Sequence, residues 1–242
     1  MVASTQRFSH RVENYIRYRP GYPDALVDLL CREARLESGS VAVDLGSGTG
    51  ILARMLLACD VSVHAVEPNA GMREAAERLL GGDPHFISHA TTAEHTGLPG
   101  HCADLITAAQ AFHWFDRALA KQEFNRLLKP GGVVTLIWNE RRVTSTAFLR
   151  DYETFLETWA TDYQEVNHAN ITPAEIAAFF DPHPVQAETF PNQQVFDYAG
   201  LEGRLMSCSY APAEDDPRHG PMLAALHALF ERHAQDGKVC FE

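Results

Sequence analysis

The amino-acid sequence predicts a doubly wound α/β fold, in which helices cover both faces of a parallel sheet. Between residues 41 and 138, short apolar runs of strand length alternate with longer segments whose apolar residues recur at helical spacing. A glycine-rich turn joins the first of these runs to the first helical segment. Right-handed crossovers assemble such alternating units into one parallel sheet. The 242 residues suffice for one well-buried α/β domain with an appendage.

The glycine-rich turn, Gly46-Ser-Gly-Thr-Gly50, follows a buried strand that ends in Asp44 and leads into a helix over residues 51–58. Glycines suit this place because the backbone must turn through conformations that are closed to residues with a Cβ. A ligand can then lie directly against the main chain. The turn therefore predicts a site for a nucleotide-like ligand.

The second predicted strand, residues 61–66, is followed directly by Glu67. An acidic residue about 20 positions beyond such a turn lies at the tip of the neighbouring parallel strand, where it can accept hydrogen bonds from both ribose hydroxyls. The spacing favours this role for Glu67 over that of an ordinary solvated carboxylate. Asn69 is expected to cap the next helix, over residues 70–80, and Gly81 to end it.

The remaining elements follow from periodicity and turn residues. Strict alternation stops after residue 142, and we interpret residues 143–184 as an insertion that caps the site, although the aromatic stripe in its first helix is also typical of a buried helix contact. We predict further strands over residues 84–90, 104–108, 133–138, 185–196 and 238–242, and further helices over residues 24–36, 117–129, 145–163, 173–180, 198–206 and 221–235.

The glycine turn alone does not decide between two classes of ligand. Gly48-Thr-Gly-Ile-Leu-Ala53 satisfies the pattern G-x-G-x-x-A of dinucleotide-binding proteins. Against a nicotinamide oxidoreductase, the chain has no Tyr-x-x-x-Lys pair to carry proton transfer. A nicotinamide enzyme and a non-catalytic cofactor-binding module therefore remain alternatives to the prediction that follows.

Four motifs taken together carry a resemblance to a known family. Their order and spacing closely resemble the class I S-adenosylmethionine-dependent methyltransferases, and within them the small-molecule enzymes of the methyltransferase type 11 and trans-aconitate methyltransferase-like kind. The motifs are Asp44–Gly50, Glu67–Asn69, Asp104–Trp114 and Leu128–Val133.

The resemblance implies a Rossmann-like, seven-stranded mixed sheet with helices on both faces and a small helical cap. The last strand of this sheet runs antiparallel, and residues 238–242 supply only a short version of it. The implied parts of the chain are an N-terminal lid over residues 1–23, a cofactor-binding core over 24–140, the helical cap over 141–184, and a C-terminal part of the core over 185–242 that carries strands six and seven.

The same resemblance implies the residues that contact S-adenosylmethionine. Thr92 stands where the family commonly has an Asp that receives the exocyclic amine of adenine, whereas the contact of the Ala93 N–H does not depend on residue type. Met72 is placed to pack on the adenine face, although a Met on a helix is also typical of plain core packing. The implied cofactor residues are Asp44, Gly46, Ser47, Gly48, Gly50, Glu67, Pro68, Met72, Thr92, Ala93, Glu94, Gln110 and Ala111 in the core, with Tyr15 and Arg19 in the lid.

The acceptor pocket is expected past the carboxyl end of the fourth strand, where ligands bind in doubly wound sheets. His113 is a candidate general base because an imidazole titrates near neutral pH, or else a histidine fixed by hydrogen bonds that shapes the pocket. The other residues implied for the substrate pocket are Tyr18, Tyr22, Trp114, Trp138 and Tyr210. Tyr22 can equally serve in packing, and a tryptophan in the place of Trp114 is more often structural.

The stretch Gln110-Ala-Phe-His113 also argues against a nucleic-acid substrate. Enzymes that methylate nucleobase amines carry an Asn- or Asp-Pro-Pro-aromatic tetrad at this place, and this chain does not. A carboxyl O-methyltransferase of trans-aconitate type would instead require a cationic pocket, for which Arg19, Arg141 and Arg142 are candidates. The leading prediction is therefore a methyltransferase that acts on a small-molecule acceptor, with the carboxyl enzyme as the alternative.

Bulk properties limit the partners and the compartment. A formal net charge of −12 argues against a broad nucleic-acid footprint, and no apolar run approaches the roughly 18 residues needed to cross a bilayer. The amino terminus lacks the apolar core of a signal peptide. The five cysteines show no C-x-x-C motif, so we expect neither a metal site nor a disulfide framework. We expect a cytoplasmic monomer or homodimer with no nucleic-acid or membrane partner.

Overall fold

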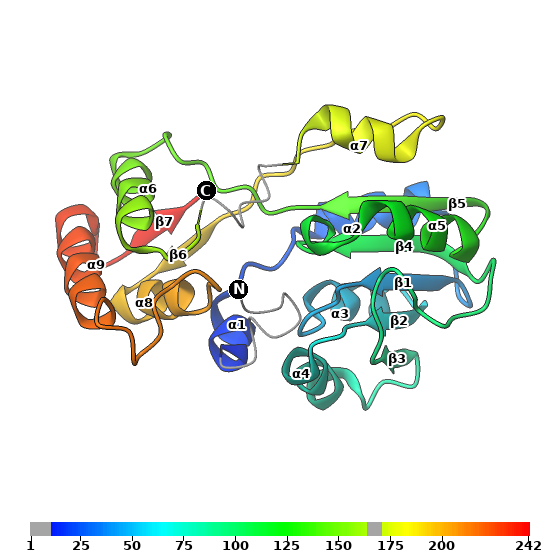
Figure 1. Ribbon diagram of the computed structural model, residues 1–242, viewed down its shortest axis with the longest axis horizontal. Helices are drawn as coiled ribbons and strands as arrows, with labels where there is room; N and C mark the ends of the chain where they lie inside the picture. The colour runs from blue at the N-terminus through cyan, green and yellow to red at the C-terminus, as the bar shows by residue number, and fades with distance from the viewer. Residues whose placement is uncertain (1–10, 164–170) are drawn as a thin grey trace. The chain divides into compact units, whose positions relative to one another are not determined.

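The computed structural model describes residues 11–163 and 171–242, which form two compact units (Figure 1). The first unit contains Gly21–Trp138 and residues 171–190, and the second contains Arg11–Pro20, residues 139–163 and Pro191–Glu242. Residues 1–10 of the predicted lid and residues 164–170 of the predicted cap lie outside the described residues. The four-part division of the chain stays a prediction, and the two units are described separately below.

The first unit is built on a five-stranded parallel sheet with the strand order β3-β2-β1-β4-β5 (Figure 1). The chain builds outward from β1 in one direction and then crosses to β4 on the other side of it. The point between β1 and β4 is therefore the topological switch point, where such sheets bind ligands at the carboxyl ends of their strands. The strands are β1 Val41–Leu45, β2 Ser62–Val66, β3 Phe86–His89, β4 Ala103–Ala109 and β5 Leu128–Ile137.

Helices bury both faces of this sheet. Along β1, Ala42 belongs to the apolar cluster formed with α2, α3 and α4, whereas Val43 belongs to the cluster formed with α5 and α7. This alternation is the period of two that a strand imposes on its side chains. The doubly wound α/β prediction is thereby confirmed. The helices of this unit are α2 Asp24–Glu33, α3 Ile51–Leu57, α4 Ala70–Leu80, α5 Arg117–Leu127, α7 Pro173–Phe180 and the short 3-10 helix η2 Phe112–Trp114.

Several of these helices begin at the capping residues that the sequence predicted. Asn69 caps α4 by accepting a hydrogen bond from the Met72 N–H, and Asp116 caps α5. Thr172 and Glu175 form the predicted capping box of α7, with a proline at its first turn. Each side chain satisfies an N–H group that the first helical turn leaves without a partner.

The second unit has its own apolar core, formed where three helices, α6, α8 and α9, meet a short antiparallel pair of strands. Phe241 on the second strand contacts Phe148 and Tyr152 with ring centroids 5.2 and 5.0 Å apart. The elements are α1 Val12–Tyr18, α6 Ala147–Trp159, α8 Tyr198–Met206, α9 His219–His233, β6 Gln194–Phe196 and β7 Val239–Phe241. The predicted cap residues thus supply α6 to this unit and α7 to the first.

The prediction of a single seven-stranded mixed sheet was wrong. The described residues form five parallel strands and a separate antiparallel pair, β6 and β7. Each strand of that pair is three residues long, and the two satisfy each other's backbone groups with Val195 opposite Cys240. The apolar side chains Val239 and Phe241 of β7 are buried in the core of the second unit, whereas Val195 of β6 is exposed. The position of β7 is therefore set by its burial against the helices of the second unit. It does not extend the parallel sheet.

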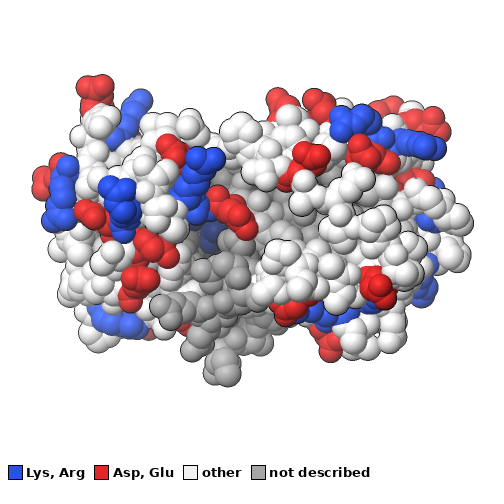
Figure 2. All heavy atoms as spheres, turned by 90° about the horizontal axis from the view of Figure 1, so that it is seen from above, with Lys and Arg blue, Asp and Glu red and all other residues white. Residues whose placement is uncertain are grey.

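Two surface properties accompany this fold. No helix among the described residues is long and apolar enough to span a bilayer. On the face drawn in Figure 2, Lys and Arg side chains are interspersed with Asp and Glu.

Candidate functional site

Three strand ends meet at the switch point of the parallel sheet. β1 ends at Leu45 beside Val66, the last residue of β2, and Asp44 lies opposite Thr107 of β4. The glycine turn follows β1, Glu67 follows β2, and Gln110 follows β4. The structure therefore brings together the three segments to which the sequence assigned the cofactor.

The three glycines of the turn all have positive φ, but they serve different ends. A Cβ on Gly46 would lie 2.5 Å from the Ala111 Cβ, and one on Gly50 would lie 2.6 Å from the Leu80 Cδ1. A Cβ on Gly48 would meet no atom within 4 Å. Gly46 and Gly50 thus permit close packing of the turn, whereas the space beside the Gly48 Cα is open to a ligand.

Glu67 ties the glycine turn to the end of β2. Its Oε2 accepts a hydrogen bond from the Gly48 N–H at 2.9 Å, and its Oε1 accepts one from the Asn69 N–H at 2.7 Å. Burial raises the pKa of Glu67, while these two hydrogen bonds and the charge of Arg73 lower it. Because each carboxylate oxygen has a second lone pair, Glu67 can still accept hydrogen bonds from a ligand. Sequence reasoning missed its backbone contacts.

Asp44 is 1% exposed and lies beneath the same turn. Its Oδ1 accepts a hydrogen bond from the Thr107 hydroxyl at 2.7 Å, and its Oδ2 has no partner among the described residues. Burial raises the pKa of Asp44 to about 7; the Thr107 hydrogen bond opposes this shift, and the nearby Glu67 carboxylate adds to it. The edge therefore holds a buried carboxyl that a cationic group would stabilise in its ionised form.

Other buried polar atoms without a partner in the described chain lie in the same segments. They are the Ser47 Oγ, the Thr49 Oγ1 and the Gln110 Nε2. Gln110 also adopts a φ of +56°, which is uncommon for a residue with a side chain. A buried polar group left unpaired costs roughly 1–3 kcal/mol. Acceptors, hydroxyls and an amide donor gathered at one edge fit a ligand that carries both charged and hydroxyl groups.

The segments predicted to surround adenine are close-packed. Met72 and Ala93 are each 3% exposed. Glu94 accepts a hydrogen bond from the Asp116 N–H at 2.9 Å, so its carboxylate also serves the start of α5, a contact that sequence reasoning missed. Pro68 lies between Glu67 and Asn69, and Thr92 forms an isolated bridge with His95. The adenine contacts of these residues stay predictions.

His113 and Trp114 lie in η2, directly beyond the end of β4. Their rings are 4.7 Å apart, and the neighbouring Phe112 is buried against Phe179 and Trp138 at 4.8 and 6.3 Å. This aromatic packing fixes η2 at the sheet edge next to Gln110. The Trp138 Nε1 is buried without a partner among the described residues. Tyr22, also predicted for the substrate pocket, packs against the core beneath α2 and α3.

The remaining lid and pocket candidates belong to the second unit. The Arg19 guanidinium donates to the Ser207 carbonyl at 3.1 Å and lies over the Tyr15 ring at 5.0 Å, while its Nε is buried without a partner among the described residues. Tyr18 packs edge-on against Phe196, and Tyr210 packs against Tyr163 with ring centroids 5.0 Å apart. Their roles toward cofactor and substrate stay predictions.

Sequence reasoning missed the polar core of the second unit, which is centred on the buried Cys208. Arg204 donates to the Cys208 Sγ at 3.2 Å, and Arg11 donates to the carbonyls of Cys208 and Ala211 at 2.7 and 2.6 Å. Burial alone would raise the pKa of Cys208, but the guanidinium groups of Arg19 and Arg204 lower it to about 7. Arg11, Arg19 and Arg204 are far apart in the sequence, so no local motif could have predicted this cluster.

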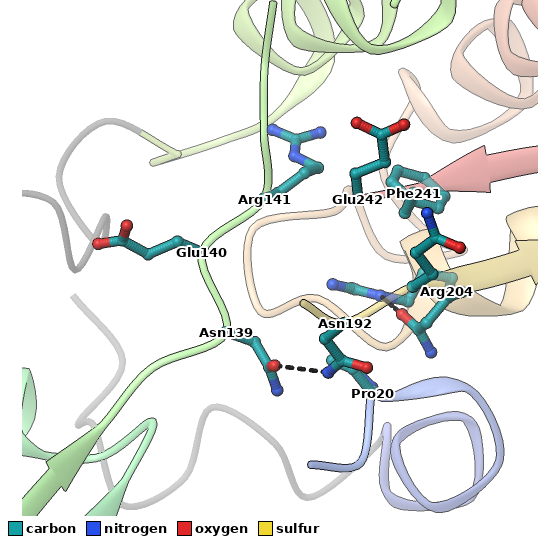
Figure 3. A pocket seen from close by; sticks show the side chains of 10 residues that line it. Pro20, Asn139, Glu140, Arg141, Asn192, Arg204, Phe241 and Glu242 are labelled. Atoms are coloured by element: carbon teal, nitrogen blue, oxygen red, sulfur yellow. Dashed lines mark hydrogen bonds between the residues drawn. The ribbon is translucent and has the colours of Figure 1, made fainter. Parts of the chain in front are cut away.

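The second unit also contains a pocket with about 380 Å³ of empty space (Figure 3). Two arginines and two glutamates line it, and its remaining lining is amide, proline and phenylalanine side chains. The Asn192 side chain donates to that of Asn139 at 2.9 Å across its wall. The charged lining residues are Glu140, Arg141, Arg204 and Glu242.

Arg141 is the better placed of the two neighbouring arginines that the sequence offered for a cationic pocket. It pairs with Glu153, donates to the Tyr163 hydroxyl at 2.9 Å and lies over the Tyr152 ring at 4.8 Å. Its Nη1 is buried without a partner among the described residues. The side chain of Arg142 is exposed and does not line the pocket. No cluster of His, Cys, Asp and Glu in the described residues could hold a metal ion.

The chain is similar to known proteins over most of the first unit. Residues 43–136 match a family model described as a methyltransferase domain. An uncharacterised methyltransferase of Mycobacterium tuberculosis is 37% identical over 134 residues, which are 55% of this chain and 52% of that protein. This chain thus spans about half the length of that relative. An uncharacterised methyltransferase of Geobacillus kaustophilus is 33% identical over 164 residues, 61% of this chain and 68% of the relative.

A solved structure extends the likeness to nearly the whole chain. It comes from Anaeromyxobacter dehalogenans and is described as a candidate type II methyltransferase. The TM-score is 0.65 at 26% identity, and the alignment covers 93% of this chain and 94% of the other.

Proposed function

Since the chain belongs to the class I S-adenosylmethionine-dependent methyltransferases, we propose that it transfers a methyl group from S-adenosylmethionine to a small-molecule acceptor. One observation supports the proposal most directly. The Gly48 Cα with open space beside it, the Glu67 carboxylate and the unpartnered oxygen of Asp44 belong to strand ends that meet at the switch point of the sheet.

The donor and acceptor groups at this edge suit the proposed cofactor. S-adenosylmethionine supplies a methyl group on a positively charged sulfur, which is already activated for transfer. The acidic pair Asp44 and Glu67 favours such a cation, because like charges at close range raise a carboxyl pKa and a cation relieves that repulsion. Glu67 is proposed to accept the ribose hydroxyls, and Ser47 and Gln110 to contact the amino-acid part. Pro68, Met72, Thr92, Ala93, Glu94 and Ala111 are proposed to line the rest of the site.

The protein's contribution to methyl transfer is chiefly positional. An in-line displacement requires the acceptor atom, the methyl carbon and the sulfur to be collinear, and holding two reactants in such geometry can supply about 7–11 kcal/mol. The rigid packing of η2 beyond β4 suits this task. A general base is needed in addition only where the acceptor atom must lose a proton.

His113 is the proposed base. If it takes the acceptor proton, His113→Asn lowers turnover by about 10²–10⁴-fold and removes a loss of rate at acidic pH, where a protonated histidine cannot act as a base. Single-turnover rates measured between pH 5.5 and 9 separate this role from a purely structural one. A variant that keeps full turnover at every pH has no need of His113 as a base.

Calorimetry with S-adenosylmethionine, S-adenosylhomocysteine and NAD(H) tests the cofactor. We expect both sulfur compounds to bind and NAD(H) not to bind; tight NAD(H) binding without sulfonium binding would overturn the proposal in favour of an oxidoreductase. A metabolite panel assayed for S-adenosylhomocysteine formation then seeks the acceptor. Cofactor binding with no turnover on any acceptor would instead indicate a non-catalytic binding module.

Carboxyl O-methyl transfer of trans-aconitate type is the alternative reaction. It is favoured by the buried guanidinium atoms of Arg19 and Arg141 that have no partner among the described residues, because such donors suit a carboxylate. The equal numbers of arginines and glutamates lining the pocket of the second unit do not strengthen it. An acceptor panel that includes tricarboxylates and their amides distinguishes the two reactions. Methylation of the acids but not of the amides supports carboxyl O-methyl transfer.

A further inference from the structure

Two cysteine thiols of the first unit lie in contact. Cys31 is near the end of α2, Cys59 follows the end of α3, and their sulfur atoms are 3.0 Å apart. Both side chains are half-buried. Among the described residues no other pair of cysteines makes such a contact. The sequence, with its scattered cysteines, gave no sign of the pair because 28 positions separate them.

The separation of the two sulfurs is close to that of a covalent bond. A disulfide needs about 2.05 Å between its sulfurs, so an approach of about 1 Å would suffice. Cys59 lies in the turn after α3, where its N–H bonds the Leu56 carbonyl at 2.9 Å. A turn residue can make this adjustment at smaller cost than a residue inside a helix, because it does not carry a helical ladder with it.

We propose that Cys31 and Cys59 form a site of reversible disulfide modification, whose reactant is a hydroperoxide. This site is separate from the methyl-transfer edge and does not depend on the proposed function. Among the described residues no carboxylate hydrogen-bonds to either thiol, although the charge of Asp28 acts on Cys31. The contact of Cys59 with the Met55 carbonyl, at 3.7 Å, is weak.

The reaction balances with one hydroperoxide per disulfide. One thiol takes an oxygen atom from hydrogen peroxide, becomes a sulfenic acid and releases one water. The second thiol then attacks that sulfur, so that the S–S bond forms, the S–O bond breaks and a second water leaves. Two electrons pass from the two thiols to the peroxide. Burial and the neighbouring Cys59 thiol raise the pKa of Cys31 to about 12, so alkaline conditions favour the reactive thiolate of Cys31.

The bond would close a ring that contains β1, the glycine turn and α3. A ring that joins positions 28 apart in the sequence restricts the unfolded chain and thereby stabilises the folded one. For a protein of this size the loop-closure effect corresponds to a rise of roughly 5–15 °C in the unfolding midpoint. The cofactor turn would then lie inside a covalently closed loop.

The test is treatment of the full chain with hydrogen peroxide at pH 8.5, followed by non-reducing digestion and mass spectrometry. We expect a peptide pair linked through Cys31 and Cys59, two mass units lighter than the reduced pair, which dithiothreitol reverses. The unfolding midpoint should rise on oxidation and fall again on reduction. Separate sulfinic acids at the two positions, or a bond to another cysteine, would overturn the proposal.

Three serine variants complete the experiment. Cys31→Ser and Cys59→Ser should each abolish both the linked peptide and the rise in midpoint. Cys102→Ser is the matched control, because Cys102 is also a half-buried free thiol but contacts neither partner. It should keep the linkage and the shift. A rise in midpoint that survives in Cys31→Ser would show that oxidation acts elsewhere.

Discussion

Two carboxylates at one sheet edge are held in opposite ways. Glu67 receives a backbone N–H on each oxygen, whereas Asp44 receives one hydroxyl and keeps one oxygen without a partner in the described chain. Hydrogen bonds favour the charged form of a carboxyl, and burial disfavours it. Burial raises the pKa of both side chains, and Asp44 has fewer hydrogen bonds to oppose the shift.

Replacement of Glu67 should weaken the cofactor site. Glu67→Ala is expected to reduce the affinity for S-adenosylmethionine by roughly 1–3 kcal/mol, the value of hydrogen bonds to a charged group, and to loosen the glycine turn through the lost Gly48 contact. Calorimetry measures the affinity. Glu74→Ala, which removes an exposed acid from α4, serves as control. Wild-type affinity in Glu67→Ala would contradict the ribose assignment.

Asp44 should give the stability of the ligand-free protein a distinctive pH dependence. Its pKa of about 7 in the folded chain exceeds its ordinary 3.8, so between these values the folded state binds more protons than the unfolded one. The free energy of unfolding then falls as pH rises, by at most about 1.4 kcal/mol per pH unit.

Asp44→Asn removes this slope. Urea unfolding at pH 5, 6 and 7 measures the free energy of unfolding. Relative to the wild type, this free energy should increase for the variant as pH rises, because only the wild type must bury a group that ionises when unfolded. Above pH 7 the difference should level off. Parallel curves for the two proteins across this range would refute the raised pKa.

At the level of elements, the glycine turn requires both positive φ angles and close packing within its five residues. Gly46→Ala should destabilise the fold more than Gly48→Ala. Both substitutions place an alanine at positive φ, which costs roughly 1–2 kcal/mol, but only the first also drives a Cβ into Ala111, and such overpacking adds about 1–3 kcal/mol. Thermal unfolding measures the difference, and equal losses would contradict the packing role of Gly46.

The elements of the first unit were predictable because local signals and periodicity agree there. The strand before Asp44, the cap at Asn69 and the capping box at Thr172 all follow from neighbouring residues. The strands β6 and β7 lie within predicted strands, but their separate antiparallel pairing did not follow, because it joins Val195 to the distant Cys240. Residues 185–193, predicted as part of a strand, have no regular structure.

The same contrast holds for the candidate site. Glycine spacing and the position of Glu67 predicted which segments meet at the switch point of the sheet, because contiguous motifs carry these segments. The backbone bonds of Glu67, the Glu94 contact with α5 and the arginines around Cys208 depend on distant pairings. No pattern along the chain encodes them. The acceptor pocket is least predictable, because positioning a substrate requires shape rather than a particular residue type.

On the scale of the whole molecule, the two units differ in how the chain supplies them. The sheet of the first unit comes from the continuous stretch Gly21–Trp138. The second unit needs Arg11–Pro20 from before that stretch and Pro191–Glu242 from after it. Arg11 joins the two pieces by bonding the carbonyls of Met206, Cys208 and Ala211.

This arrangement sets an order for folding during synthesis. Domains form on the ribosome roughly as their residues emerge, so the parallel sheet can assemble once Trp138 has left the exit tunnel. The segment Arg11–Pro20, although made earlier, must wait for partners that are translated almost two hundred codons later. The earliest helix of the described chain is thus among the last to find its place.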